Sequence, residues 1–290
     1  QKAVLEWTGF NIGAGNSVVF VQPNSSSVAL NRVIGASASQ IYGSLSANGQ
    51  VFLVNANGIY FAPGAQVEVG GLVASTLGIS NANFLAGQYV DLILRDGTRR
   101  SFSMANAPHD DAFLRLHLRN YGGPFSQYVF NTLKEKDILR LEGPLGTFFL
   151  REDSDKPMVL LASGTGFAPI KALLEHMQHK NIQRPARLYW GGRRPSDLYM
   201  NDWIMAQLAH MPNLQYIPVV SDALPEDNWS GRTGFVHASV LQDLPDLSAH
   251  QVYACGAPVV IESAQRDYAA HGLPAEEFFA DSFTSEADKL

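Results

Sequence analysis

The sequence predicts a mixed fold, with a β-rich N-terminal part followed by an α/β part. Three observations support this prediction. The 290 residues include 21 Lys+Arg and 27 Asp+Glu, yet residues 1–80 carry only four of these charges. That stretch consists of short β-prone runs between turns rich in Gly, Asn and Ser. From residue 157 onward, apolar runs typical of buried parallel strands alternate with amphipathic helical segments.

Residues 1–80 are expected to form coils stacked on one another. Asparagines and glycines stand between the β-prone runs, where the chain reverses or takes positive φ. Few charges suit coils whose backbone ladders and turn amides supply the polar bonding. A small β-sandwich is the alternative. The first histidine is His109 and the single cysteine is Cys255, so this stretch offers no candidate catalytic cluster. The runs are 17–21, 27–30, 51–54 and 66–69.

Three motifs in this part, at residues 10–13, 55–61 and 69–77, carry a family resemblance. They resemble the N-terminal secretion domain of filamentous-haemagglutinin-type exoproteins of two-partner secretion systems. The resemblance implies a partial right-handed parallel β-helix over residues 1–86, with an outer-membrane transporter as its partner. Ala56 stands where members of that family have proline.

Residues 87–150 are predicted to form a small antiparallel sheet. Alternating residues 87–94, a turn at Asp96-Gly97 and a return over 99–106 indicate a hairpin. The spacing also predicts a third strand over 113–118, a short helix over 124–133 and a strand over 137–141. The glycine turn before the helix exposes N–H groups that favour an anion.

The string Arg100-Ser101-Phe102-Ser103, followed by Ala105-Asn106, resembles the flavin motif of the ferredoxin-NADP reductase family. The resemblance implies that Arg100 pairs with the FAD pyrophosphate, that Phe102 packs on the isoalloxazine, and that Ser103 lies near flavin N5. A solvated arginine beside a core aromatic is the alternative. The second pyrophosphate-binding turn of the family matches Gly122, Gly123, Phe125 and Ser126.

That family's barrel begins with two further strands, whose place is taken here by the secretion-domain-like sequence. The antiparallel flavin-binding β-barrel expected over residues 87–152 is therefore incomplete. The changeover falls within residues 83–89. This arrangement indicates a gene fusion.

Residues 153–290 are predicted to form a doubly wound parallel α/β nucleotide domain, whose ligands bind at the carboxyl ends of the strands. An apolar run over 157–162 ends at Ser163-Gly164-Thr165-Gly166, and a helix follows. A strand, a glycine turn and a helix start suit a dinucleotide phosphate. Pro169 stands where a Rossmann fingerprint has its third glycine, so an ordinary βα turn stays an alternative. The expected strands are 158–162, 186–191, 214–220 and 251–255, and the expected helices are 168–179, 202–210, 235–243 and 258–271.

The reductase resemblance extends from about Leu85 to Phe283, and the most similar subgroup is the flavin reductases of deoxysugar synthesis and aromatic oxygenases. It implies that Cys255 lies beside the nicotinamide and that Phe283 covers the flavin. The alternatives are core packing for Cys255 and a hydrophobic tail anchor for Phe283. The subgroup favours NADH over NADPH, although Arg193 and Arg194 could meet a 2′-phosphate. The implied NAD(P)H-binding residues are Gly164, Thr165, Gly166, Arg193, Gly256 and Pro258.

Several classes of protein are disfavoured by composition. A net charge of −6 without a basic stripe disfavours nucleic-acid binding. One cysteine excludes an intrachain disulfide and an iron-sulfur cluster held by this chain. His176 and His179 lack a third ligand, so solvated helix positions are favoured over a metal site. Without a long apolar run or a signal-peptide pattern, the reductase part is expected to be soluble and cytoplasmic.

The resemblance implies an FAD-dependent NAD(P)H oxidoreductase that passes hydride to flavin N5 and electrons to an unknown external acceptor. Ser103, Cys255 and Phe283 would shape the reacting centre. One alternative is a secretion-targeting or adhesin fragment with an inactive reductase passenger, and another is an accidental fusion with no single evolved role. The expected domains are residues 1–86, 87–152 and 153–290.

Overall fold

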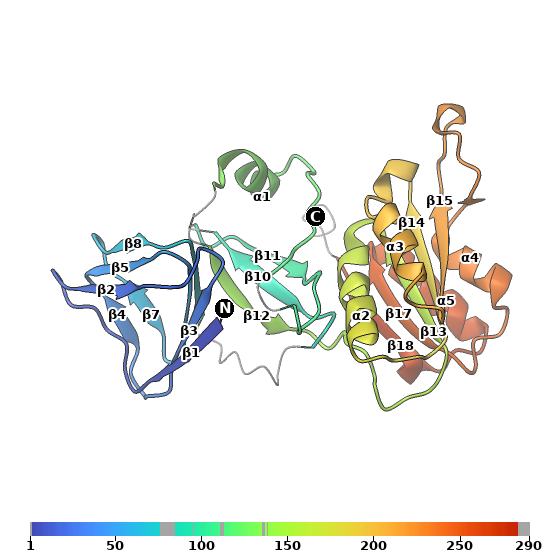
Figure 1. Ribbon diagram of the computed structural model, residues 1–290. Coiled ribbons are helices and arrows are strands. Elements are labelled where there is room, and N and C mark those ends of the chain that lie inside the picture. Colours follow the sequence, from blue (N-terminus) through green and yellow to red (C-terminus); the bar gives the residue numbers. More distant parts are fainter. Residues whose placement is uncertain are drawn as a thin grey trace. The chain divides into compact units, whose positions relative to one another are not determined.

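The computed structural model describes residues 2–75, 85–94, 96–110, 113–134, 137 and 139–283 (Figure 1). The chain divides into two compact units. The first contains the described residues of 1–84, 89–102 and 119–145, and the second those of 85–88, 103–118 and 146–290. The predicted three-domain boundaries stay a prediction. No helix among the described residues is long and apolar enough to cross a membrane.

The N-terminal strands of the first unit form three sheets in which every named pair is parallel. The sheet orders are β1-β3-β6-β9, β2-β5-β8 and β4-β7. From β3 onward the chain visits these sheets in a repeating order. The strands are β1 Lys2–Trp7, β2 Ser17–Phe20, β3 Val28–Val33, β4 Ser39–Ile41, β5 Ser44–Ala47, β6 Gln50–Asn55, β7 Ile59–Phe61, β8 Gln66–Glu68 and β9 Gly71–Ser75.

Parallel pairing contradicts the β-sandwich alternative, because a sandwich is built from antiparallel sheets. Apolar side chains such as Ile41, Leu45 and Leu53 are buried between the three sheets. Two buried asparagines supply polar bonds there: Asn31 accepts from the Trp7 indole at 3.0 Å, and Asn55 donates to the Ser37 carbonyl at 2.9 Å. The expected role of asparagine amides is confirmed. The right-handed β-helix stays a prediction.

The predicted hairpin is present as β10 Tyr89–Ile93 and β11 Arg99–Ser103. With β12 Arg140–Leu145 they form a sheet in the order β11-β10-β12. β12 begins three residues later than predicted, because its antiparallel ladder with β10 starts where Arg140 pairs with Ile93. Within this unit, β9 and β12 are in contact. The predicted helix is confirmed as α1 Pro124–Gln127 followed by a π-helical turn at Tyr128–Thr132.

The predicted strand over 113–118 is wrong. That segment makes one isolated bridge, Met104 to Leu116, instead of a ladder. The buried Asn106 side chain explains the difference. Its amide donates to the Asp110 and Phe113 carbonyls at 2.6 and 2.9 Å and accepts from the Arg115 N–H at 2.8 Å. These local bonds replace ladder bonds.

The second unit contains a six-stranded parallel sheet in the order β16-β15-β14-β13-β17-β18. Its strands are β13 Met158–Ser163, β14 Ala186–Gly192, β15 Leu214–Val220, β16 Arg232–Thr233, β17 Gln251–Gly256 and β18 Phe278–Ser282. Its helices are α2 Phe167–His179, α3 Asn201–Leu208, α4 Val236–Asp243 and α5 Pro258–Ala270. The four predicted strands and four predicted helices are confirmed within one or two residues.

Each strand of this sheet sends alternate side chains to two apolar cores. Leu160 lies in the core that α2 and α3 cover, and Leu161 lies in the core that α4 and α5 cover. Figure 1 shows the helices on both faces. Because strands buried on both faces need apolar side chains at every position, the continuous apolar runs in the sequence are explained.

Candidate functional site

The strand order reverses at β13, which lies between β14 and β17. In open α/β sheets, ligands bind at the carboxyl ends of the strands next to such a reversal. Two glycine-containing turns follow β13 and β17 at this point. A Cβ added to Gly166 would lie 2.1 Å from the Cys255 carbonyl oxygen, and one added to Gly256 would lie 2.6 Å from the Ser163 Cβ. The two turns are therefore packed backbone to backbone.

Gly164 faces open space, whereas Gly166 faces the backbone of Cys255. It has φ +54°, and a Cβ added there would meet nothing within 4 Å. The indole of the buried Trp190 donates to the Gly164 carbonyl at 3.0 Å, and this bond holds the turn against the core. α2 begins directly afterwards and has no side-chain cap at its first turn. The turn therefore leaves room beside a helix start, which fits a dinucleotide phosphate.

Ser103 and Cys255, far apart in the sequence, meet at Asp281. The Ser103 hydroxyl donates to Asp281 Oδ2 at 2.7 Å, and the Cys255 Sγ lies 3.9 Å from the same oxygen. β17 and β18 are parallel, with Cys255 opposite Asp281 in register. Ser103 is 4% exposed and Cys255 is fully buried. The last residue of the flavin motif and the end of β17 therefore share one carboxylate.

Burial decides the electrostatics of this cluster. It raises the pKa of Asp281, while hydrogen bonds from Ser103 and Cys255 act in the opposite direction. Burial, reinforced by the negative charge of Asp281, raises the pKa of the Cys255 thiol well above its usual value. Cys255 therefore stays a thiol at neutral pH, in agreement with the expectation that it is no nucleophile.

We expect the ionisation of Asp281 to make stability depend on pH. Because its pKa is raised on folding, the folded chain holds this proton at pH values where the unfolded chain has lost it. The free energy of unfolding should fall as the pH rises from the unfolded pKa near 3.8 through the folded pKa. Denaturant titrations across this range should show a smaller decrease for Asp281→Asn than for the wild type. Equal slopes would contradict the assignment.

The other predicted flavin-binding residues lie in the first unit. The Phe102 and Phe125 rings are 5.3 Å apart between centroids. Gly122 has φ +78°, and a Cβ on Gly123 would meet nothing within 4 Å. Gly123 caps α1 without a side-chain bond, and the Ser126 hydroxyl accepts from the Tyr121 N–H at 3.4 Å. An aromatic pair and a turn with open space thus fit the motif locally.

Arg100 lies on β11, and its Nη1 donates to the Arg99 carbonyl at 2.7 Å. Ser103 ends the same strand but belongs to the second unit. The structure therefore brings Ser103 and Cys255 together, and it describes Arg100, Phe102 and the turn of residues 122–126 within the other unit.

The arginines expected near the coenzyme are paired with carboxylates. Arg193 and Arg194 each bring Nη2 to 3.5 Å from Asp222 Oδ2, and Arg194 also pairs with Asp227. The carboxylate of Asp197 accepts from both arginine backbone N–H groups, at 2.9 and 3.0 Å. Asp197, which follows β14, therefore closes its own turn with this carboxylate.

Pro258 begins α5 directly after the Gly256 turn. Phe283 donates its N–H to the Gly256 carbonyl at 2.9 Å, and its partly buried ring packs against the core that contains Cys255. This contact suits the tail-anchor alternative as well as a position beside the site. The role of Phe283 stays a prediction.

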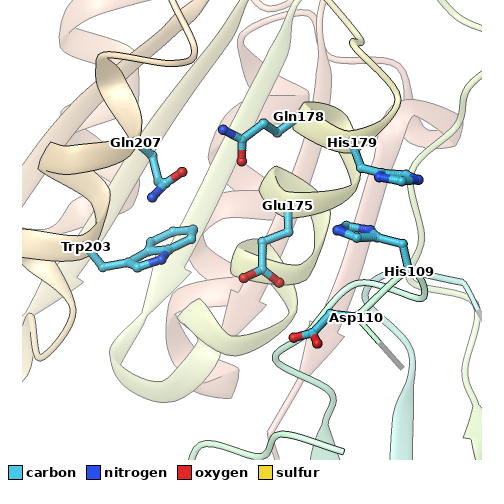
Figure 2. A pocket seen from close by; sticks show the side chains of 7 residues that line it. All are labelled: His109, Asp110, Glu175, Gln178, His179, Trp203 and Gln207. Carbon is cyan, nitrogen blue, oxygen red and sulfur yellow. The ribbon is translucent and has the colours of Figure 1, made fainter. Parts of the chain in front are cut away.

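The two α2 histidines do not share a metal site. His176 Nε2 lies 2.8 Å from Glu152 Oε1, while His179 stacks on His109 with ring centroids 3.9 Å apart. Among the described residues, no group of three His, Cys, Asp or Glu side chains could hold a metal ion. Figure 2 shows the two rings stacked on each other, and both rings line a pocket of about 450 Å³. Its other lining residues are Asp110, Glu175, Gln178, Trp203 and Gln207.

Sequence reasoning missed the roles of three residues: Asp281, Trp190 and Lys171. Asp281 directly follows the apolar residues 278–280 near the end of the predicted nucleotide domain, which could have drawn attention to it. Lys171 stands on the apolar face of α2, four residues after Phe167 and four before Glu175. A lysine and a glutamate at that spacing on a buried face indicate a buried ion pair.

Comparison with known proteins matches two parts of the chain to oxidoreductase domains. An oxidoreductase NAD-binding domain model matches residues 160–266, and an oxidoreductase FAD-binding domain model matches residues 76–150. A probable flavin reductase of Aliivibrio fischeri is 32% identical over 209 residues, which cover 70% of this chain and 87% of that protein. The chain belongs to the flavin reductase family of ferredoxin-NADP reductase type.

Other members of this reductase family are longer. The CDP-6-deoxy-L-threo-D-glycero-4-hexulose-3-dehydrase reductase of Yersinia pestis is 48% identical over 204 residues, which cover 69% of this chain and 60% of that protein. The crystal structure of the Amycolatopsis cytochrome P450 reductase GcoB matches with a TM-score of 0.65 at 31% identity, covering 70% of this chain and 62% of that one. The chain thus spans about 60% of the length of such relatives. A TPS secretion domain model matches residues 1–104.

Proposed function

We propose that the chain is an FAD-dependent NAD(P)H oxidoreductase that passes electrons to an external acceptor. The shared carboxylate of Asp281 carries this proposal, because it joins the serine of the flavin motif to the cysteine at the nucleotide turn. Bound NAD(P)H supplies a hydride, and bound FAD supplies a two-electron acceptor. The Amycolatopsis relative is named a cytochrome P450 reductase, which supports a protein acceptor.

The residues of the chain bind and orient the two coenzymes in this proposal. Gly164, Thr165 and Gly166 form the turn that accepts the NAD(P)H pyrophosphate, and Gly256 and Pro258 form the facing turn. Ser103 is the hydrogen-bonding group beside the reacting centre, and Asp281 fixes the direction of its hydroxyl. The neutral, buried Cys255 thiol supplies a contact surface without a competing nucleophile.

Asp222 supports NADH as the coenzyme. Its carboxylate lies within 3.5 Å of both Arg193 and Arg194 Nη2 atoms, so it offsets their positive charge and would repel a 2′-phosphate. A ribose hydroxyl carries no charge and meets no such repulsion. Initial rates with NADH and NADPH for wild type and Asp222→Ala would test this preference. We expect the variant to be faster than the wild type with NADPH and unchanged with NADH.

The basic test is spectroscopic. The purified chain is expected to take up FAD, to show the visible absorbance of an oxidised flavin, and to bleach when NADH is added anaerobically. A protein that neither takes up FAD nor bleaches it would contradict the proposal.

We expect Arg100→Ala to weaken FAD binding. A charge-assisted hydrogen bond to a phosphate contributes about 1.5–3 kcal/mol, so the Kd for FAD should rise about 10- to 100-fold. Fluorescence titration of the apoprotein would measure the Kd. Arg99→Ala is the matched control, since Arg99 on the same strand pairs with Glu142 at 2.6 Å. Equal weakening in both variants would contradict the role of Arg100.

A second function is favoured by the match of residues 1–104 to a secretion domain. We propose that this part is a fragment of a right-handed β-helical secretion domain, and the three parallel sheets support it. An outer-membrane transporter would then be its partner, and the reductase part would be an inactive passenger. Co-expression with a two-partner transporter tests this alternative. Export of the chain would support it, and retention would count against it.

A further inference from the structure

One buried lysine on α2 holds the segment that follows Ser103. Lys171 is 6% exposed, and its Nζ donates to the Ala105 carbonyl at 2.9 Å. The same Nζ pairs with Glu175 Oε1 and lies 5.0 Å from the centroid of the Trp203 ring. An ammonium group buried to this degree needs such partners, because an unpaired buried charge is costly. Figure 2 shows Glu175 and Trp203 beside each other.

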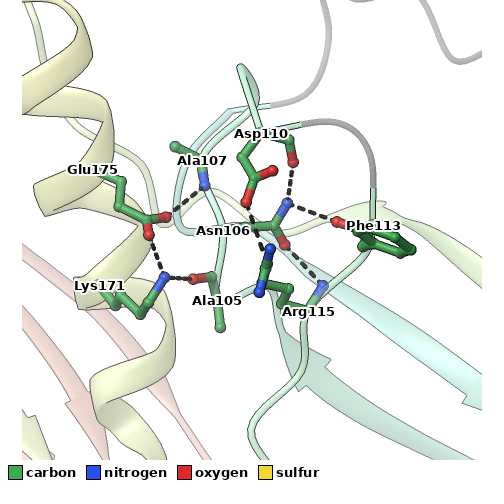
Figure 3. Close-up of polar contacts among 8 residues, drawn as sticks. All are labelled: Ala105, Asn106, Ala107, Asp110, Phe113, Arg115, Lys171 and Glu175. Carbon is green, nitrogen blue, oxygen red and sulfur yellow. Dashed lines mark hydrogen bonds and ion pairs between the residues drawn. The ribbon is translucent and has the colours of Figure 1, made fainter. Parts of the chain in front are cut away.

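Glu175 bonds the same segment two residues further along, at Ala107. Its Oε2 accepts from the Ala107 N–H at 3.2 Å, while its Oε1 pairs with Lys171. The two side chains thus bind the backbone on both sides of Asn106, as Figure 3 shows. We call Lys171 and Glu175, with their bonds to Ala105 and Ala107, the α2 clamp.

The segment that the clamp holds is also hydrogen-bonded on its other side. The Ala105 N–H donates to the Arg115 carbonyl at 2.8 Å, and the Met104 N–H donates to the Gln88 carbonyl at 2.9 Å. Asn106 is 3% exposed and bonds only to its own loop in the contacts described above. The α2 clamp therefore links this loop directly to α2 in the nucleotide-binding half.

The clamp also connects the two ends of the candidate site. α2 begins at Phe167, directly after the Gly164–Gly166 turn, and Lys171 lies one turn further along it. Ala105 follows Ser103 by two residues. Movement of Ala105 relative to α2 would therefore change the separation between the Ser103 hydroxyl and the nucleotide turn.

We propose that Lys171, with Glu175, is a positioning residue that sets the place of Ser103 for hydride transfer. The expected effect on the rate of hydride transfer rests on the proposed function. The expected effect on the position of residues 104–107 rests on the contacts of the α2 clamp alone. Lys171 acts through the backbone of residues 104–107 and touches neither coenzyme.

The first experiment needs no coenzyme. Hydrogen–deuterium exchange of the full apo chain is compared for wild type, Lys171→Met, Glu175→Gln and the control Lys180→Met, whose side chain is exposed at the C-terminal cap of α2. The amides of residues 104–107 are expected to exchange about tenfold faster in the first two variants, with α2 itself unchanged. Unchanged exchange in the Glu175→Gln variant, or equal acceleration in Lys180→Met, would overturn the proposal.

The second experiment is anaerobic rapid mixing of the FAD-loaded chain with NADH. Lys171→Met is expected to lower the limiting rate of flavin reduction about 10- to 100-fold, since a misplacement near 1 Å costs that much. The NADH dissociation constant and the FAD content should change less than about twofold, and Lys171→Arg should recover part of the rate. A folded, FAD-loaded Lys171→Met variant with the wild-type limiting rate would overturn the proposal. A wild type that binds no FAD would instead contradict the proposed function, and the exchange experiment would still decide the clamp.

Discussion

Replacing Gly166 with alanine is expected to disrupt the junction between the two nucleotide turns. The added Cβ would lie 2.1 Å from the Cys255 carbonyl oxygen and 2.8 Å from the Gly256 Cα. These are backbone atoms at the end of a central strand, so neither can move aside as a flexible side chain would. Overpacking of this kind costs about 3 kcal/mol, and the distorted turn should also lose NADH affinity.

Denaturant unfolding of the apo chain would measure this effect, and an NADH titration would measure the loss of affinity. Gly123→Ala is a suitable control for stability, because a Cβ there meets nothing within 4 Å and its φ of −73° suits alanine. Similar losses of unfolding free energy in the two variants would show that the close contact at Gly166 is not the cause.

Replacing Ser103 with alanine is expected to slow the reduction of FAD by NADH about 100-fold, the usual effect of removing one hydrogen-bond donor from a reacting centre. Among the described residues, the variant leaves the buried Asp281 carboxylate with the weak thiol donor of Cys255 at 3.9 Å. The limiting rate in anaerobic rapid mixing is the quantity to measure.

Ser101→Ala is the matched control for this prediction. Ser101 lies two residues earlier on β11, is exposed, and donates to Asp91 Oδ1 at 2.6 Å instead of to the site. Its replacement should leave the limiting rate unchanged. If both serine variants reduced FAD at the wild-type rate, Ser103 would have no part in the chemistry.

Four of the six strands of the α/β half, and its four α-helices, could be predicted from the sequence, because each of these elements carries its own signal, whereas β16 and β18 were not among the expected strands. Continuous apolar runs such as 158–162 need burial on two faces, and the amphipathic segments between them need one apolar face each. The structure of the antiparallel part was harder to predict from the sequence. Residues 113–118 alternate as a strand does, yet Asn106 bonds the loop beside them and prevents a ladder. A side chain that competes with the ladder leaves no periodic signal.

The sequence by itself determined the chemical types at the site: a flavin motif ending in Ser103, a glycine turn at 164–166 and a single cysteine at the end of a strand. The tertiary structure alone decided that Ser103 and Cys255 meet at Asp281, and that Lys171 holds Ala105. These contacts join positions 178, 26 and 66 residues apart. Local periodicity reports which face of an element is buried. It contains no information on which distant side chain shares that burial, because that depends on how the sheet and its helices pack.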